Sequence, residues 1–452
     1  MVNEFEVSVG LCPGQGGYRQ GALDAVRICP RAAEAVAVID ETTSEVLGRS
    51  LLATLAEHAA LRDEELFAAE PELVQLAIFA TSVGVFEVFQ ADGAGVSVLI
   101  GHSLGEIAAL VCSGALSVAE GARILCHRLA VLREHDSSGG GMLALACGRE
   151  RTERILELLP TAGLVVAVDN GPPQTAVSGP AEALRRVERI AEAIGVPSIR
   201  LHAAHPYHNA LLQAARDALT ERICGHHGRT FAIPVFSPVL GRYYRSQDDL
   251  GELLAAHLTS PVQFGPALQR AQAAGARVWV ELGANRTLTN LVRSVRPDDT
   301  LLTPLAGPAA ALEKAVAFLA GQPGLLRTAA DAARVPAAVT APPMASNPDP
   351  PPALDTSPPS GGPPLSREDI EARIRTIYAT ALEYPEEVFE PTAELEADLG
   401  VDSVKQVELM ARLGEEFALG SRPEGLRMGD YRTFGRLVDF VDDALSVGNG
   451  HR

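Results

Sequence analysis

Ser103 lies in a sequence pattern that can turn a serine into a nucleophile. The stretch SVLIGHSLGEIAALVCSGAL (residues 97–116) carries a G-x-S-x-G pattern between an apolar strand-like run and a helix-like run. Such a pattern predicts a nucleophile elbow, because small glycines permit a strained turn that projects the serine outward. The N-terminus of the next helix would then face negative charge that develops during a reaction. The simpler alternative is a strand–helix turn that holds an incidental serine.

Three histidines in the stretch HAAHPYHNALLQ (residues 202–213) raise the question of a metal site. At positions 202, 205 and 208 they would spread over too wide an arc of a helix, and Pro206 would break such a helix. No nearby carboxylate completes a ligand set, so we expect no metal here. A histidine can instead act as the general base that a serine nucleophile requires.

These motifs, together with the loop PGQGG at residues 13–17, resemble those of the malonyl-CoA:acyl carrier protein transacylase family, which includes the acyltransferase domains of polyketide synthases. The resemblance covers residues 5–320. It implies that Ser103 takes an acyl group from a coenzyme A thioester and that His208 is the general base. It also implies that the backbone N–H groups of Gln15 and Leu104 hold the oxyanion.

The same resemblance gives roles to four further residues around this pair. His205 is expected to shape the pocket, and His102, beside the nucleophile, is expected to line the substrate channel. His257 falls where the family uses a backbone carbonyl to orient the catalytic histidine, which makes a Ser–His dyad without a triad aspartate. Tyr207, directly before His208, is expected to reduce the room beside the α-carbon of the substrate.

Arg128 bears on the substrate class. By spacing alone, an arginine on the expected helix 119–133 would be a solvated surface residue. It lies 25 positions after Ser103, where the family places the arginine that grips the free carboxylate of malonyl-type substrates. A guanidinium fork matches a carboxylate with two parallel hydrogen bonds. The bulk of Leu104 and Tyr207 favours malonyl over methylmalonyl.

Three positions depart from the family pattern. Tyr18 stands in place of the second glutamine of GQGxQ, and Glu70 stands where a glutamine commonly precedes Pro71. Asn285 ends the stretch Gly-Ala-Asn (283–285), where Gly-Pro-Gly is usual. None of these changes removes a catalytic group. They leave the exact acyl group open, because a carboxylate such as Glu70 would be unfavourable if it were buried near a malonyl site.

Ser403 is the second serine in surroundings that suggest chemistry. It follows Asp402 in the stretch LEADLGVDSVKQVELM, and apolar residues at helical spacing come after it. Asp402 can cap such a helix, while a phosphate on Ser403 would be favoured at the positive helix end. The Asp-Ser step alone is also compatible with an ordinary capped helix. The whole stretch, however, resembles the attachment motif of acyl carrier proteins over residues 366–446, which implies a covalent 4′-phosphopantetheine arm on Ser403.

The elements that must position these residues alternate between strands and helices, which predicts an α/β fold. We expect an α/β-hydrolase-like acyltransferase core. Residues 141–202 follow the order β-α-β-β-α-β, which predicts a ferredoxin-like subdomain. The C-terminal unit is predicted to be an all-α four-helix carrier bundle with Ser403 at the start of its second helix. The expected core strands are 7–11, 96–100 and 277–282, the expected core helices 72–89, 105–113 and 310–319, and the expected carrier helices 367–382, 403–417, 426–431 and 434–444.

Composition divides the chain into an acyltransferase domain (1–321, with the ferredoxin-like insert at 141–202), a linker (322–364) and a carrier domain (365–446). Residues 336–364 contain 11 prolines, which predicts an extended, semi-rigid linker. Residues 366–446 hold 19 acidic and 9 basic residues, while the whole chain has a net charge of −19. This concentration of negative charge disfavours nucleic acid as a partner. It favours docking of the carrier on positive patches of partner enzymes.

Cysteine usage and hydropathy predict a cytoplasmic protein. The six cysteines are scattered without a CxxC pair, so neither a disulfide framework nor a zinc site is expected. The sequence contains no run of 18 uncharged apolar residues and no basic N-terminal region followed by an apolar one. We therefore expect no membrane partner.

Taken together, these features predict a transacylase that loads its own or a partner carrier. Ser103 would take an acyl group, malonyl in our interpretation, from coenzyme A and pass it to the arm on Ser403. No condensing-enzyme or reductase motif is found, so a ketosynthase would act in trans, and a phosphopantetheinyl transferase would attach the arm. Starter-unit loading, an acyl-editing hydrolase and a non-catalytic docking scaffold remain alternatives. Arg128 argues against the hydrolase, and the intact Ser103 and His208 argue against the scaffold.

Overall fold

The structure is a computed structural model. It describes residues 7–321 except 160, 162, 226–227 and 307–309, and then residues 366–382, 389–393, 395, 409–410, 412–413, 416–417 and 433–449. The predicted linker 322–364, Ser403 and the predicted helix 426–431 lie outside the described residues.

A six-stranded sheet forms the base of the large unit, with the strand order β11-β10-β1-β2-β7-β8. Neighbouring strands from β11 to β7 are parallel, and β8 is antiparallel to β7. Such sheets are buried on both faces, which explains the continuous apolar runs at the predicted strand positions. The strands are β1 (Val7–Cys12), β2 (Val98–Gly101), β7 (Val235–Ser237), β8 (Arg242–Tyr243), β10 (Ala276–Glu281) and β11 (Thr300–Leu302).

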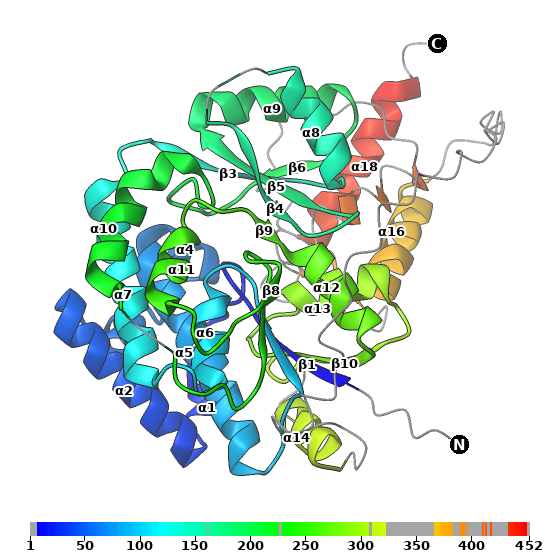
Figure 1. Ribbon diagram of the computed structural model, residues 1–452. Coiled ribbons are helices and arrows are strands. Elements are labelled where there is room, and N and C mark those ends of the chain that lie inside the picture. Colours follow the sequence, from blue (N-terminus) through cyan, green and yellow to red (C-terminus); the bar gives the residue numbers. More distant parts are fainter. Residues whose placement is uncertain are drawn as a thin grey trace.

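Helices cover this sheet, with α2, α5 and α7 on the left and α12 and α13 on the right of the view in Figure 1. Apart from two that cover a second sheet, the described helices of the large unit are α1 (Ala22–Val26), α2 (Pro30–Leu47), α3 (Leu51–Glu57), α4 (Asp63–Ala69), α5 (Pro71–Ala91), α6 (Gly105–Cys112), α7 (Val118–His135), the 3₁₀ helix η1 (Ala210–Leu212), α10 (Gln213–Ile223), α11 (Leu250–Ala256), α12 (Phe264–Ala273), α13 (Thr287–Val295) and α14 (Ala311–Gly321).

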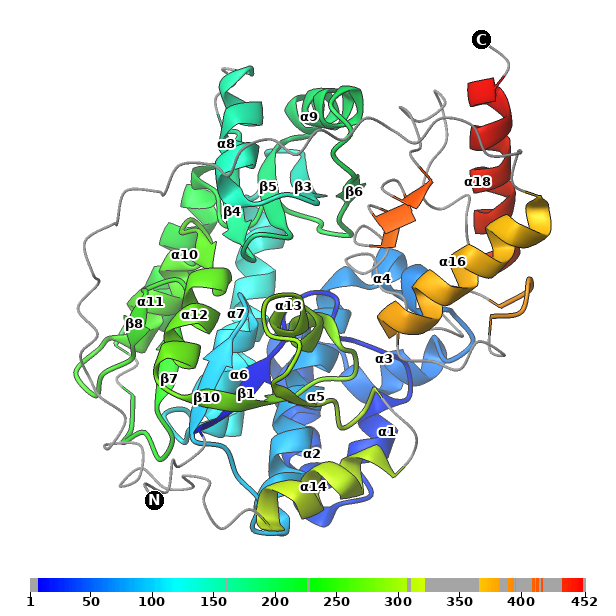
Figure 2. The same cartoon turned by 90° about the vertical axis from the view of Figure 1, so that its right-hand side faces the viewer.

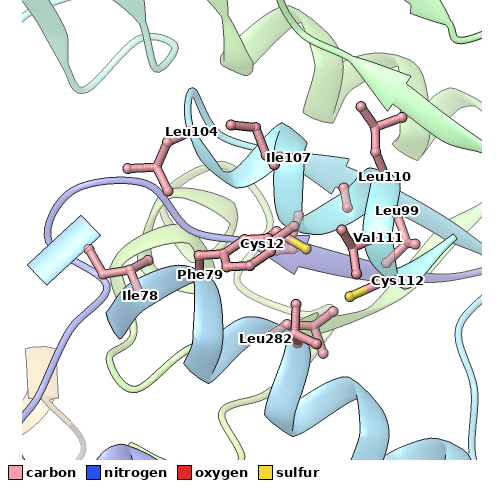
Figure 3. Close-up of a cluster of buried hydrophobic side chains, with 14 of the residues drawn as sticks. Cys12, Ile78, Phe79, Leu99, Leu104, Ile107, Leu110, Val111, Cys112 and Leu282 are labelled. Atoms are coloured by element: carbon pink, nitrogen blue, oxygen red, sulfur yellow. The ribbon is translucent and has the colours of Figure 1, made fainter. Parts of the chain in front are cut away.

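Helix α5 is the centre of the helical layer. Its length and apolar composition would suffice to cross a membrane, yet 89% of its most apolar window is buried inside the protein, as in a core helix. Figure 3 shows Phe79 and Ile78 of α5 among side chains of β1 and α6, including Cys12 and Leu110. Full burial of one such side chain contributes about 1.5–3 kcal/mol. This cluster supports the strand–helix junction that carries Ser103.

A second, five-stranded sheet has the strand order β6-β3-β5-β4-β9. The four strands of the predicted insert are paired antiparallel, and α8 and α9 cover them above the large sheet in Figure 1. This arrangement confirms the ferredoxin-like subdomain. The fifth strand, β9, comes from a distant part of the sequence and was not predicted. The elements are β3 (Gly140–Leu145), α8 (Arg149–Glu157), β4 (Val165–Asp169), β5 (Thr175–Pro180), α9 (Ala181–Ala193), β6 (Ser198–Arg200) and β9 (Val262–Gln263).

The C-terminal unit has its own apolar core. It contains α16 (Arg367–Leu382) and α18 (Phe434–Asn449), which confirm the first and last predicted carrier helices and are seen side by side in Figure 2. Tyr378, Phe389 and Phe434 pack with ring centroids 5.5–6.3 Å apart. The described residues between 409 and 416 are helical, as expected of the predicted second helix.

Candidate active site

Ser103 stands in a strained turn between β2 and α6. Its φ is +56°, and among the described non-glycine residues only His208, with φ +60°, shares this left-handed conformation. Such backbone costs on the order of 1–3 kcal/mol and collects at functional sites. The glycines on either side permit the turn, since a Cβ at Gly105 would lie 2.1 Å from the carbonyl oxygen of Cys12, and one at Gly101 would lie 2.2 Å from the Glu106 nitrogen.

Substitution Gly105→Ala should therefore destabilise the large unit. The added methyl group would force strand β1 and helix α6 apart, which costs on the order of 3 kcal/mol in the free energy of unfolding. Gly95→Ala is the matched control, because nothing lies within 4 Å of its added Cβ. Denaturant unfolding of both variants measures the effect, and equal midpoints would contradict the close-packed elbow.

Ser103 and His208 meet across a separation of 105 residues. The Ser103 Oγ lies 2.7 Å from His208 Nε2, and His208 Nδ1 lies 2.9 Å from the carbonyl oxygen of Ser260. Since a carbonyl only accepts, Nδ1 carries the proton and Nε2 is free to accept one from Ser103. Burial, helped by the positive charge of Arg128, lowers the pKa of His208 to about 3. The ring is therefore neutral and can act as a base.

The orienting carbonyl differs from the one predicted. The family resemblance assigned this role to His257, but the hydrogen bond runs to Ser260, three residues further on. The His257 carbonyl makes a smaller contribution, which raises the pKa of His208 slightly. The His257 ring instead faces Tyr244 and the buried Glu106. Burial raises the pKa of Glu106 to about 8, so this carboxyl carries a proton at neutral pH.

The two predicted oxyanion donors border the same pocket as Ser103. Leu104 is the N-cap residue of α6, and Gln15 lies in the turn Gly14–Gly17. Within the part of the chain that the structure describes, neither backbone N–H has a backbone acceptor. A helix N-terminus leaves such donors free. Both groups are thus available for negative charge on a substrate.

Arg128 is buried, contrary to what spacing alone suggests. It lies on α7 with 4% of its surface exposed, and its Nη1 donates to Gln75 Oε1 at 2.8 Å. Its guanidinium lies 5.0 Å from the centre of the Tyr207 ring. No carboxylate among the described residues forms an ion pair with it, and burial lowers its pKa. An unpaired buried cation that lines a pocket is an attractive site for an anionic ligand.

The remaining predicted residues divide between the pocket and its surroundings. Tyr207 and His102 line the pocket, and His102 Nε2 donates to Asn170 Oδ1 at 2.9 Å. His205 does not line it. Its Nδ1 lies 2.6 Å from Asp136 Oδ2, and its ring packs edge-to-face against Tyr207, with the ring centroids 5.7 Å apart. Glu70 pairs with Arg49 at 2.7 Å and is also absent from the pocket, so the suspected repulsion of a malonyl group does not arise.

The pocket lies between the two sheets. One wall comes from the large unit, with the Ser–His pair and Arg128, and the other comes from strands β3, β4 and β5. The aliphatic part of the lining is contributed by Leu104, Met142, Ala144, Val168, Ala176, Leu201, Leu288 and Leu291. Within the described ranges, no group of three or more His, Cys, Asp or Glu side chains is arranged to hold a metal ion.

Sequence reasoning missed four polar residues that act beside the predicted set. Gln75 joins Arg128 to Tyr207, with its Nε2 3.1 Å from the tyrosine oxygen. Asn170 and Gln174 hold each other at 2.6 Å and border the pocket, and Ser260 orients His208. Only Gln75 offered a clue in the sequence, because it is a long, uncharged polar side chain within the apolar stretch of the predicted helix 72–89.

Comparison with known proteins gives a family match for each of the two parts of the chain. The model of the acyl transferase domain matches residues 9–315, and the model of the phosphopantetheine attachment site matches residues 372–441. Erythronolide synthase EryA3 of Saccharopolyspora erythraea is 30% identical over 291 residues, which are 64% of this chain and 9% of that synthase. Malonyl CoA-acyl carrier protein transacylase of Bacillus subtilis (strain 168) is 28% identical over 291 residues, 63% of this chain and 89% of that protein. The chain thus spans a small part of the large synthase and most of the transacylase.

Solved structures support the same assignment. The acyltransferase domain from module 8 of the salinomycin polyketide synthase superposes with a TM-score of 0.63 at 26% identity, over 71% of this chain and 78% of that one. Malonyl CoA-acyl carrier protein transacylase (fabD) from Coxiella burnetii gives a TM-score of 0.63 at 25% identity, over 70% of this chain and 99% of that one. Since the acyl transferase model covers more than half of its length, this chain belongs to the acyl transferase domain family, and a phosphopantetheine attachment domain follows in the same chain.

Proposed function

We propose that this protein transfers a malonyl-type acyl group from coenzyme A to a carrier thiol, its own or that of a partner carrier, for a polyketide- or fatty-acid-type assembly line. The proposed division is an acyltransferase domain (1–321), a linker (322–364) and a carrier domain (365–446) with the arm on Ser403. A phosphopantetheinyl transferase would attach the arm, and a ketosynthase would use the product, both in trans.

The substrate class is inferred from Arg128, which is buried in the same pocket as Ser103 and His208 and has no carboxylate partner among the described residues. A free carboxylate on the acyl group would supply the missing counter-charge through two charge-assisted hydrogen bonds. An acyl group without a carboxylate would leave the cation unpaired in an apolar setting, which is costly. The pocket therefore favours a dicarboxylic acyl group, and the bulk of Tyr207 and Leu104 favours malonyl within that class.

The proposed reaction proceeds in two steps at one serine. In the first, Ser103 Oγ attacks the thioester carbonyl while His208 Nε2 takes its proton, and the backbone N–H groups of Gln15 and Leu104 stabilise the oxyanion. When the carbon–sulfur bond breaks, His208 returns the proton to the leaving thiol of coenzyme A. The acyl group is then an ester of Ser103.

The second step reverses the first with a different thiol. The phosphopantetheine arm, when attached, supplies the acceptor thiol. His208 takes the proton of that thiol as the new carbon–sulfur bond forms, and it returns a proton to Ser103 Oγ when the ester bond breaks. The apolar wall of β3, β4 and β5 suits a narrow pantetheine chain, which coenzyme A and the carrier share.

Intact-mass analysis of the full chain tests the proposal. After treatment with a phosphopantetheinyl transferase and coenzyme A, the wild type should gain one arm, located by peptide mass at Ser403, and Ser403→Ala should gain none. With malonyl-coenzyme A, Ser403→Ala should gain one malonyl group on Ser103, and the wild type should carry a second on the arm. Ser103→Ala should acquire neither. An arm at another residue would defeat the carrier assignment, and acylation of Ser103→Ala would defeat the nucleophile.

A further inference from the structure

The turn that contains Gln15 accepts hydrogen bonds from two side chains that lie 269 and 271 positions after Gly16 in the sequence. Gly17 N donates to Gly14 O at 3.1 Å, and Gly16 has a φ of +96°. Because Gln15 is not among the residues with positive φ, this is a type II turn, which requires glycine at its third position. The turn lies against the nucleophile elbow, since a Cβ at Gly14 would be 2.7 Å from His102 O.

Asn285 donates two hydrogen bonds to the backbone of this turn and of the residue that follows it. Its Nδ2 donates to Gly16 O at 2.7 Å and to Tyr18 O at 3.0 Å. Thr287 adds a second donor to the Gly16 carbonyl, with its Oγ1 at 3.2 Å. A carbonyl oxygen has two lone pairs, so these two donors fix the orientation of the Gly16–Gly17 peptide. Asn285 occupies the position at which the sequence departs from the family's usual Gly-Pro-Gly, and a glycine there has no side chain to donate.

We propose that Asn285 is a positioning residue for the oxyanion hole, with Thr287 as its support. By clamping the far corner of the Gly14–Gly17 turn, its carboxamide keeps the Gln15 N–H in place beside Ser103. Preorganised donors stabilise a transition state because they need no reorganisation during the reaction. Without these hydrogen bonds the turn would have to become ordered each time the transition state forms, and this ordering would raise the activation free energy. The inference rests on the proposed function of Ser103 as the acyl-accepting nucleophile.

The test compares Asn285→Ala, Asn285→Asp and Thr287→Val with wild type. Asn285→Ala should lower kcat/KM about 10- to 100-fold with little change in KM, because the Gln15 N–H that Asn285 positions stabilises the oxyanion only in the transition state. Asn285→Asp, which keeps the side-chain size but replaces the donor with an acceptor, should lose at least as much. Thr287→Val should lose less. Asn290→Ala is the matched control, because Asn290 lies in helix α13 (Thr287–Val295), which begins two residues after Asn285, and it should behave as wild type.

Two readouts separate positioning from a merely structural role. A trifluoromethyl ketone analogue of an acetyl-pantetheine thioester forms a tetrahedral oxyanion on a serine, so its affinity should fall by the same factor as kcat/KM. The factor should also be equal for malonyl- and acetyl-coenzyme A, because both develop the same oxyanion. A higher KM at unchanged kcat, an unchanged affinity for the ketone, or a loss confined to malonyl would overturn the inference. Failure of the ketone to react with wild type would instead defeat Ser103 as the nucleophile.

Discussion

Replacing His208 by alanine should slow acylation of Ser103 by about 10²–10⁴-fold, the usual effect of removing a general base. The reason is geometric, since Nε2 lies 2.7 Å from the serine oxygen and its lone pair is free. Rapid-quench measurement of the acyl-enzyme with malonyl- and acetyl-coenzyme A gives the rate. Both substrates should be affected alike, because the proton comes from Ser103 in each case.

Two variants control for the backbone and for the choice of histidine. His208→Asn keeps a side chain that tolerates the left-handed backbone at φ +60°, and it should be as slow as the alanine variant. His205→Ala should cost far less, since His205 contacts Asp136 and lies outside the pocket lining. A larger loss for His205→Ala than for His208→Ala would place the base elsewhere.

The pH dependence of acylation follows from the depressed pKa of His208. An ordinary histidine would become protonated as the pH fell through about 6.5 and would stop acting as a base. His208 has a pKa of about 3, so it stays neutral, and the acylation rate should not fall across that range. The charge of Arg128 contributes to this depression, so Arg128→Ala should move any acid limb of the profile to higher pH. A limb near pH 6.5 in wild type would contradict the buried, neutral base.

Substitution Arg128→Ala should raise the activation free energy of malonyl transfer by about 2–5 kcal/mol. This is the usual cost of truncating one partner of a buried charge pair. This corresponds to a roughly 30- to several-thousand-fold lower kcat/KM. Acetyl transfer should fall little or even improve, because removal of the unpaired cation relieves a desolvation cost. The measured quantity is the ratio of kcat/KM for malonyl- and acetyl-coenzyme A.

Controls on the same helix make this ratio specific. Arg123 also lies on α7 but pairs with Glu45 and is exposed, so Arg123→Ala should leave the ratio unchanged. Arg128→Lys keeps the charge but loses the planar fork, and it should retain only part of the malonyl preference. Gln75→Leu should act in the same direction as Arg128→Lys, since it releases the guanidinium that Gln75 holds. An unchanged ratio in Arg128→Ala would remove the basis for the malonyl assignment.

Local sequence patterns were sufficient to predict much of the fold. Apolar strand runs, the helix at 72–89 and the β-α-β-β-α-β order depend on neighbouring residues, and each was found within a few positions of its prediction. The elbow around Ser103 was equally legible, because the glycines that permit its strained turn lie beside it in the chain. Strand β9 was missed because two residues are too few to show a period, and its partner β4 lies far away in the sequence.

The sequence by itself determined the family, the α/β core, the ferredoxin-like subdomain and the short motifs in which Ser103 and His208 stand. Only the tertiary structure decided which residues surround them. Gln75 reaches Arg128 across 53 positions, Ser260 reaches His208 across 52, and Asn285 reaches Gly16 across 269. The physical reason is that a hydrogen bond depends on where two atoms lie in space. Periodicity and motif spacing describe one element at a time, whereas these contacts arise only when sheets and helices from distant parts of the chain pack together.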